Sequence, residues 1–397
     1  MKITSVDLIA LERDPGCLSR PVLCRVFTDD GLYGIGEAGV AIGTGAPAAF
    51  AQMKDIVPML LGADPLENEV LWEKMFRQSF WAQGNGAIVM AAISALDIAL
   101  WDIKAKAANL PLYKLLGGKH RNRLRCYASQ LQFGWGVDSF NPQKGASGEP
   151  AYYAEMAQKA AAEGYTAVKV NFMRFNKNGA LLPYTAAITH LEKDFLRLVE
   201  ARIRAVRDAV GPDVEIIMEN HAMTSAGTAV QIANIAEPYG IMFFEEPALA
   251  LNPAVMRKIA ERTTIPLATG ERTYTRWGFL PFLENNSLQI IQPDIGNCGG
   301  ITEAKKICDM AHIYDVGVQA HVCSSPVSVA VALHLEAALS NFVIHEHHLC
   351  NTLTSTIVEC VHDYQPKNGY FEVPEIPGHG NDVHESVLRG AYIETVK

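Results

Sequence analysis

Residues 241–272 read IMFFEEPALALNPAVMRKIAERTTIPLATGER. A short apolar run ends in Glu245, a helix-like segment follows, and a second apolar run ends in Glu271. Strands that alternate with helices in this way are typical of parallel βα units. The stretch therefore predicts two parallel strands, each with a carboxylate at its carboxyl end.

The same repeat continues on both sides of this stretch, with steps of 26, 26, 23, 27 and 25 residues. The polar residues that end the successive apolar runs are Glu219, Glu245, Glu271, Asp294, His321 and Glu346. Together with earlier strands at 125–129 and 169–171, about eight units fit, which predicts an α/β protein with a (β/α)8-type barrel. The polar end residues would then surround one mouth, where such barrels carry their active sites.

The N-terminal part of the chain has a different pattern. KITSVDLIAL at 2–11 and PVLCRVFTDDGLYGIGEA at 21–38 alternate as antiparallel strands, with a turn at 29–31. AAISALDIALWDIKAKAA at 91–108 has the apolar spacing of an amphipathic helix.

These patterns predict three segments. We expect an α+β unit over residues 1–124 and the barrel, with the active site, over residues 125–361. A turn-rich tail over residues 362–397 is expected to return to the N-terminal unit.

The composition narrows the class of protein. Apolar residues make up 49% of the chain and charged residues 19%, unlike a disordered or coiled-coil protein. No apolar run is long enough to predict a membrane span, and the net charge of −9 disfavours nucleic acid and anionic membranes as partners. The eight cysteines form no CxxC pair and no signal peptide is recognisable, so we expect reduced thiols in a cytoplasmic protein.

Residues 34–39, GIGEAG, match the GxGxxG pattern of dinucleotide-binding loops. That fingerprint requires a βαβ unit, whereas antiparallel strand patterns precede these residues and further glycines follow at 43 and 45. We therefore expect a glycine-rich loop near the barrel mouth and not a nicotinamide-dependent oxidoreductase.

Three strand-end carboxylates indicate a metal site. Glu219, Glu245 and Glu271 lie on consecutive predicted strands and would repel one another unless a cation neutralised them. Ligation by oxygen alone favours Mg²⁺ over zinc. Glu246 points the other way along its strand and is interpreted as structural.

Two histidines are candidates for proton transfer. Asp294 precedes His321 by one strand, and a carboxylate beside an imidazole fixes its tautomer and makes it a general base. His221 lies two residues after Glu219, on the same face of the expected strand. It is a candidate metal ligand, substrate hydrogen-bond partner or general acid, and we favour the acid.

Other polar residues follow the second and last strands. Lys169 and Asn171 share one side of the second strand, and Arg174 and Lys177 continue into the following loop. These two cations either reach a substrate carboxylate or belong to a solvated loop, and we favour the solvated loop. In the segment 345–348, HEHH, we expect Glu346 to be functional and the histidines to be structural.

Taken together, these residues resemble the enolase superfamily, in its mandelate racemase-like branch, over nearly the whole chain. The motifs that carry the resemblance are GIGEA, the helix at 91–108 with the residues after it, FEEP, TGER, QPDIGNCGGITE, QAHVCSSP and the tail PGHGNDV. The resemblance implies a modified TIM barrel closed by a capping domain, which the N-terminal unit and the C-terminal tail form together.

The resemblance also implies roles for the site residues. The metal ligands for Mg²⁺ would be Glu219, Glu245 and Glu271; the base dyad His321 and Asp294; and the residue that supports the enolate oxygen Glu346.

Within that branch the chain is most similar to the D-galactonate dehydratases. These proteins have a lysine-x-asparagine like Lys169–Asn171, an acid-x-histidine like Glu219–His221, and a GER motif like the one containing Arg272. The similarity implies His221 as general acid and Lys169, Asn171 and Arg272 as substrate-binding residues. Two positions depart from the pattern, because Glu219 stands where Asp is usual and His379 where an apolar residue is common.

The resulting expectation is a Mg²⁺-dependent acid-sugar dehydratase, a hydro-lyase that forms a 2-keto-3-deoxy acid from a D-galactonate-like aldonate. Racemases of the family use a second lysine where this chain has Asn171, which cannot transfer a proton. A sugar-acid or lactone cycloisomerase or epimerase is the alternative, and a non-catalytic binding barrel is a further one. The expected partners are a small acid sugar and, as in relatives, further copies of the chain.

Overall fold

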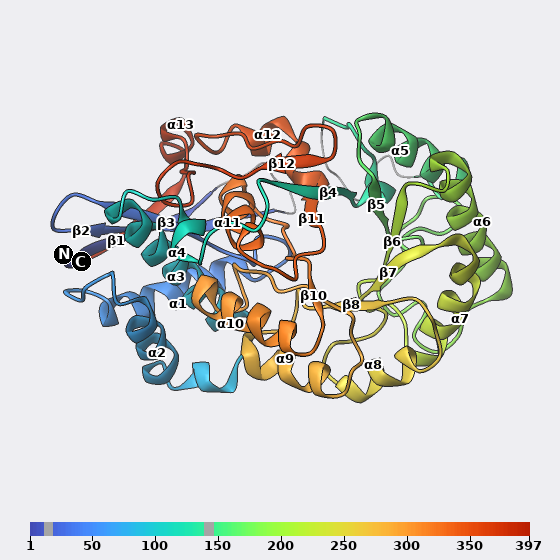
Figure 1. Cartoon of the computed structure of the whole chain (residues 1–397), viewed down its shortest axis with the longest axis horizontal. Helices are drawn as coiled ribbons and strands as arrows, with labels where there is room; N and C mark the ends of the chain where they lie inside the picture. Colours follow the sequence, from blue (N-terminus) through green and yellow to red (C-terminus); the bar gives the residue numbers. More distant parts are fainter. Residues whose placement is uncertain (12–18, 139–146) are drawn as a thin grey trace.

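The computed structural model describes residues 1–11, 19–138 and 147–397 (Figure 1). Cys17, one of the eight cysteines, lies outside the described residues. The seven cysteines within the described ranges are free thiols. No helix of the described ranges combines the length and the apolar character needed to cross a bilayer.

The two ends of the chain form one antiparallel sheet. The N-terminal strands are β1 (Ile3–Ala10), β2 (Val22–Thr28) and β3 (Tyr33–Ala38), and the last strand, β13 (Tyr392–Val396), pairs with the free edge of β1. The sheet order is β13-β1-β2-β3, and the N- and C-termini lie together in Figure 1. The predicted return of the tail to the N-terminal unit is thus confirmed.

Helices cover this sheet and complete the capping domain. They are α1 (Ala46–Ile56), the 3₁₀ turn η1 (Val57–Met59), α2 (Asn68–Gln78), the 3₁₀ turn η2 (Trp81–Gly84), α3 (Ala87–Ala107) and the short α4 (Leu112–Leu115). Helix α3 packs against β3 on one side and against the barrel helix α10 on another, so most of its residues are buried. This explains why α3 is apolar on nearly all sides.

The glycines of GIGEAG serve this packing. A Cβ on Gly36 would lie 1.9 Å from the Ala95 carbonyl oxygen, and one on Gly34 would lie 2.1 Å from that of Ala99. Only glycine permits so close an approach between β3 and α3. The expectation of a glycine-rich loop is therefore wrong for most of this motif, because residues 34–38 form a strand whose partner helix is distant in sequence.

Eight parallel strands form the second sheet. They are β4 (Arg123–Ser129), β5 (Ala167–Val170), β6 (Glu215–Glu219), β7 (Ile241–Glu245), β8 (Leu267–Thr269), β9 (Ile290–Ile291), β10 (Gly317–Val318) and β11 (His345–His348). Neighbours follow chain order, and β11 pairs with β4. Val318 of β10 hydrogen-bonds with Asn341 and Val343, just before β11, so the sheet curls round on itself. The predicted modified TIM barrel is confirmed.

Helices connect the strands on the outside of the barrel (Figure 1). They are α5 (Pro150–Ala162), α6 (Lys193–Val210), α7 (Ala226–Ala236), α8 (Pro253–Ala260), α9 (Thr275–Glu284), α10 (Gly300–Ile313) and α11 (Pro326–Ala337). The 3₁₀ turns η3 (Leu131–Phe133) and η4 (Glu237–Tyr239) follow β4 and α7.

After β11 the chain returns to the capping domain. It passes through η5 (Leu349–Thr352), α12 (Thr354–Ile357), β12 (Tyr370–Glu372) and α13 (Glu385–Leu388). Strand β12 pairs antiparallel with the start of β4. His379, one of the two departures from the family pattern, is buried in this tail, with its Nε2 3.0 Å from the Ile35 carbonyl oxygen. The predicted segment boundaries at 124 and 361 stay predictions, and β4 already begins at Arg123.

The capping domain is attached directly at the barrel mouth. The Gly39 N–H donates to the Gly296 carbonyl at 2.7 Å, and the Ser325 hydroxyl donates to the Glu37 carboxylate at 2.7 Å. A Cβ on Gly39 would lie 2.6 Å from Asp294 Oδ1. The segment after β3 is thereby held against the loops that follow β9 and β10.

Candidate active site

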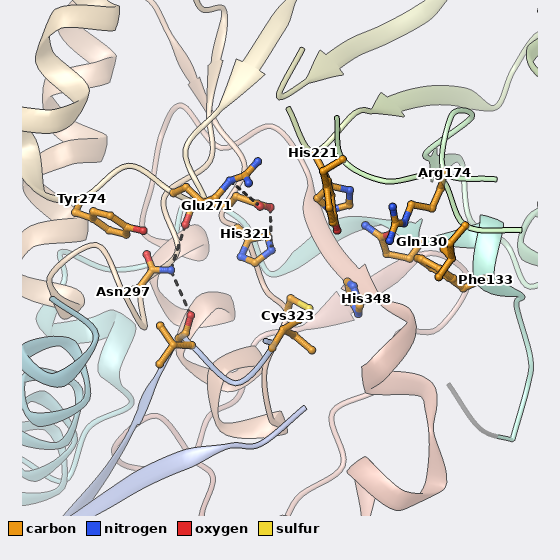
Figure 2. Close-up of a pocket in the computed structure, with 16 residues that line it drawn as sticks. Gln130, Phe133, Arg174, His221, Glu271, Tyr274, Asn297, His321, Cys323 and His348 are labelled. Carbon is orange, nitrogen blue, oxygen red and sulfur yellow. Dashed lines mark hydrogen bonds and ion pairs between the residues drawn. The ribbon is translucent and has the colours of Figure 1, made fainter. Parts of the chain in front are cut away.

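A cavity of about 550 Å³ lies where the capping domain meets the carboxyl ends of the strands. This volume is in the usual range for sites that bind small molecules. Gly39, Val40 and Ile42 line it from the capping domain, and residues of the barrel loops line the rest (Figure 2). Of the ten predicted site residues, His221, Glu271, Arg272 and His321 face this cavity.

A group of buried charges lies beside the cavity. Lys169 Nζ is 3.1 Å from Glu219 Oε2, 2.8 Å from Glu245 Oε1 and 2.9 Å from Glu346 Oε1. All four side chains are at most 1% exposed. The predicted neighbours are therefore brought together, but Lys169 meets protein carboxylates, and its role in binding substrate stays a prediction.

The pKa values reflect one ammonium shared by three carboxylates. Burial alone would lower the pKa of Lys169, but the three glutamates outweigh it and raise that pKa well above its usual value. Burial, with the charge of Glu219, raises the pKa of Glu245 to about 8. Burial opposes ionisation of Glu346 as well, yet Lys169 lowers the pKa of that carboxyl. One ammonium group therefore does not balance the three carboxylates. Burial then favours the neutral form of a carboxyl group that has no cation beside it.

The arrangement fits a divalent cation. Glu219 Oε1 and Glu245 Oε2 are buried and have no hydrogen-bond partner among the described residues. One ligand atom from each of Glu219, His221 and Glu271 lies within 4.8 Å of the other two. Buried carboxylate oxygens without partners are costly, and a hard cation such as Mg²⁺ satisfies them.

The two residues predicted as a base dyad, His321 and Asp294, are in contact. His321 Nδ1 lies 2.7 Å from Asp294 Oδ2, and His321 Nε2 lies 3.3 Å from Glu271 Oε2. Asp294 Oδ1 accepts the N–H of Gly296 at 2.8 Å, so the carboxylate is held in place. Burial would lower the pKa of His321, but Glu271 and Asp294 raise it to about 10.

His221 lies directly beyond the end of β6. Its Nε2 is 3.5 Å from Glu219 Oε1, and its Nδ1 is 3.3 Å from the Asn171 amide nitrogen. The backbone at His221 has a φ of 44°, a left-handed conformation that is uncommon for residues other than glycine. Strand alternation is therefore not what places His221 beside Glu219; a turn after β6 does so.

Arg272 lines the cavity, but its charge is engaged. Its guanidinium donates to both oxygens of Glu246, through Nε at 3.0 Å and through Nη2. Arg272 Nε also lies 3.6 Å from Glu271 Oε1. Glu246 is fully buried, which agrees with its interpretation as structural.

The structure adds residues that sequence patterns missed. His348 lines the cavity while its Nδ1 accepts the Cys350 N–H at 3.0 Å, and its interpretation as structural stays a prediction. Gln130 lines the cavity and donates to Glu219 Oε2 at 2.9 Å. Arg174, for which we favoured a solvated loop over contact with a substrate carboxylate, also faces the cavity. Gln130 and Arg174 leave from loops, where the strand repeat carries no signal, whereas His348 is the last residue of β11.

The arrangement agrees with comparisons to known proteins. Residues 152–387 match the family model of the enolase C-terminal domain-like proteins, and residues 18–117 match that of the mandelate racemase / muconate lactonizing enzyme N-terminal domain. The chain belongs to the enolase superfamily. The resemblance inferred from the motifs is thereby confirmed.

Individual members of the enolase superfamily match over the whole chain. The D-galactonate dehydratase of Ralstonia pickettii is 32% identical over 98% of this chain and 94% of its own length. A crystal structure of an enolase-superfamily member from Salmonella Typhimurium is 50% identical, with a TM-score of 0.96 and full coverage of both chains. The 3,6-anhydro-D-galactonate cycloisomerase of Zobellia galactanivorans is 28% identical, with a TM-score of 0.83 over 99% of this chain and 100% of its own. The prediction of a hydro-lyase agrees with the similarity to the Ralstonia dehydratase.

Proposed function

We propose that this enzyme is a Mg²⁺-dependent acid-sugar dehydratase. It removes the proton on the carbon next to a carboxylate, and the β-hydroxyl then leaves as water to give a 2-keto-3-deoxy acid. The expected substrates are acid sugars with a D-galactonate-like configuration at the reacting carbons. The observation that carries this proposal is that two imidazoles, His321 and His221, face one cavity beside a carboxylate cluster.

The metal would be held by Glu219, Glu245 and Glu271. When bound, Mg²⁺ supplies positive charge that stabilises the substrate carboxylate as negative charge develops on it. The unpartnered oxygens of Glu219 and Glu245 support this assignment. Glu346, held by the Ser129 hydroxyl at 2.7 Å and the Val322 N–H at 3.0 Å, is fixed in place beside them.

His321 is the general base. Asp294 holds the Nδ1 proton of the ring, so that Nε2 points into the cavity with a lone pair available once it is deprotonated. Glu271 contributes to the high pKa of His321. A cation held by Glu271 would offset that negative charge and lower the pKa of the base.

His221 is the general acid. The Asn171 amide faces its Nδ1, which leaves Nε2 as the atom that carries the transferable proton. Burial lowers the pKa of His221 to about 4, despite the opposing charge of Glu271. Near pH 7 the ring is therefore neutral, so the acid role requires that the ring takes up a proton when substrate is bound.

A cycloisomerase or epimerase of sugar acids is the second candidate. The structural likeness to the Zobellia cycloisomerase supports it, because the two reactions share removal of the α-proton. They differ in whether water is lost. The cytoplasmic location and assembly into homo-oligomers remain part of the proposal.

A screen of aldonic and aldaric acids with Mg²⁺ tests the proposal, with semicarbazide to trap any 2-keto product. We expect product from at least one acid sugar, and its loss with EDTA, in His321→Ala and in His221→Ala. His312→Ala is a matched control, because this histidine lies on the outer helix α10 and does not line the cavity. Exchange of the α-proton without ketone formation would favour the second candidate.

A further inference from the structure

Arg174 is a fixed cation at one wall of the cavity. It lies in the loop between β5 and α6, and its Nη1 donates to the Leu182 carbonyl at 2.6 Å. The Leu182 N–H returns a hydrogen bond to the Arg174 carbonyl at 3.0 Å, and the guanidinium lies over the Tyr184 ring, 4.5 Å from its centroid. The head group is therefore positioned before any ligand binds, which lowers the entropy that binding costs.

The charge of Arg174 has no counter-ion in the described structure. No carboxylate of the described residues lies within ion-pair distance of it, whereas the other cavity arginine, Arg272, is held by Glu246 on two nitrogens. The Leu182 carbonyl uses only part of the hydrogen-bonding capacity of the guanidinium, which has five N–H groups. The unused donors and the uncompensated charge are suited to an anionic oxygen pair.

The proposed roles of the two histidines determine how the substrate is oriented in the cavity. This inference therefore rests on the proposed function. The α-carbon lies at His321 and the β-hydroxyl at His221. In Figure 2, His221 lies between His321 and Arg174, and Asn171, which contacts the His221 ring, precedes Arg174 by three residues on the same loop. The carbon chain beyond the β-carbon therefore runs toward Arg174.

We propose that Arg174 recognises a second carboxylate at the far end of the substrate. The preferred acid sugar is then a diacid, with a galactonate-like configuration at the reacting carbons and a terminal carboxylate in place of the terminal alcohol. A guanidinium binds a carboxylate through two parallel hydrogen bonds with charge assistance, but binds a hydroxyl group through one weaker contact. Arg174 is thus a specificity-determining residue.

Binding to a variant that cannot turn over tests this most simply. With His321→Ala and Mg²⁺, calorimetry compares galactonate with galactarate and gluconate with glucarate, pairs that differ only at the terminal carbon. We expect the diacid of at least one pair to bind at least 30-fold more tightly than its monoacid. Addition of Arg174→Gln should reduce that preference to less than 3-fold, and Arg174→Lys should retain part of it.

Lys177 is the matched control, because it is an exposed cation of the same loop that does not line the cavity. Lys177→Gln should keep the full preference for the diacid, and melting temperatures check that each variant is folded. Equal affinity for both members of every pair, an equal loss of both in Arg174→Gln, or no binding of any acid would overturn the inference.

The two proposals fail in different ways. Dehydration of monoacids and diacids with equal kcat/KM removes the role of Arg174 and leaves the dehydratase intact. A diacid preference in binding that depends on Arg174, without dehydration of any acid sugar, supports the anion site and removes the proposed reaction.

Discussion

His321 Nδ1 lies 2.7 Å from Asp294 Oδ2, across a separation of 27 residues. The other oxygen of Asp294 accepts the Gly296 N–H, and Gly39 of the capping domain packs against the same carboxylate. The carboxylate that orients the proposed base is therefore also in contact with the capping domain.

Replacement of Asp294 by Asn should disable the base. Because Oδ1 is fixed by Gly296, the amide nitrogen would face His321 and donate to Nδ1, which places the ring proton on Nε2. We expect kcat to fall by about 10²–10⁴-fold, the usual contribution of a positioned general base. Steady-state kinetics check this, with the melting temperature as a test of folding. A kcat within 3-fold of the wild-type value would contradict the role of the dyad.

Replacement of Lys169 by Met should destabilise the protein. The change leaves Glu219, Glu245 and Glu346 buried without their shared ammonium. Loss of one partner from a buried ion pair costs about 3–5 kcal/mol. Urea denaturation in EDTA should show this loss, and Mg²⁺ should reverse part of it. The same loss with and without Mg²⁺ would argue against a cation at these carboxylates.

Mg²⁺ should stabilise the native protein in a saturable way. A ligand that binds only the folded state at 100 times its Kd adds about 2.7 kcal/mol to the free energy of unfolding. Thermal denaturation against Mg²⁺ concentration measures this, and Glu271→Gln should weaken the response at least tenfold in midpoint concentration. Glu336→Gln is the control, since this buried carboxylate binds His345. An unchanged response in Glu271→Gln would count against the ligand assignment.

Acid should destabilise the fold through buried histidines. Burial lowers the pKa of His334 to about 3, against 6.5 in the unfolded chain. The unfolded state therefore takes up a proton first, so the stabilising contribution of neutral His334 is complete above pH 6.5 and is lost as the pH falls toward 3. At 1.36 kcal/mol per pH unit the loss is about 2 kcal/mol at pH 5.

His334→Asn tests this assignment. Asparagine keeps an acceptor for the Tyr113 N–H, which His334 Nδ1 accepts at 3.2 Å, but does not titrate. The free energy of unfolding should then depend less on pH between 7 and 5 than in the wild type. Parallel pH profiles for the two proteins would show that other groups dominate.

The β3–α3 contact should not tolerate a side chain. Gly36→Ala places a methyl group against the Ala95 carbonyl and should cost about 1–3 kcal/mol in stability. Gly84→Ala, where a Cβ meets no atom within 4 Å, is the matched control and should change stability by no more than about 0.5 kcal/mol. Chemical denaturation of both variants compares them; equal stability would mean that β3 and α3 adjust without cost.

The strand-end residues could be predicted because parallel βα units repeat at a nearly constant length. That repeat located Glu219 and Glu245 at the ends of β6 and β7 and Glu271 just beyond the end of β8. Lys169 contacts the first two of these together with Glu346. His221 was correctly predicted to lie beside Glu219, but the argument from strand alternation was wrong. The residue lies in a turn with positive φ and not in β6.

The loop residues could not be predicted in the same way. Gln130 reaches Glu219 across 89 residues, and its backbone φ of 70° has no simple sequence signature. Arg174 faces the cavity because the loop after β5 folds over the mouth, which depends on long-range packing, whereas His348 ends β11. The glycines at 34 and 36 were ambiguous for a similar reason, because the helix that requires them lies about sixty residues later in the chain.

The most direct test of the central claim is NMR spectroscopy of the reaction in D₂O with Mg²⁺ and the acid sugars that bind. A dehydratase loses the C2 proton and the C3 hydroxyl together and yields a 2-keto-3-deoxy acid with one deuterium at C3. Our account predicts this product from the wild type and none from His321→Ala. Deuterium at C2 of an otherwise unchanged or epimerised acid, with no ketone, would contradict it.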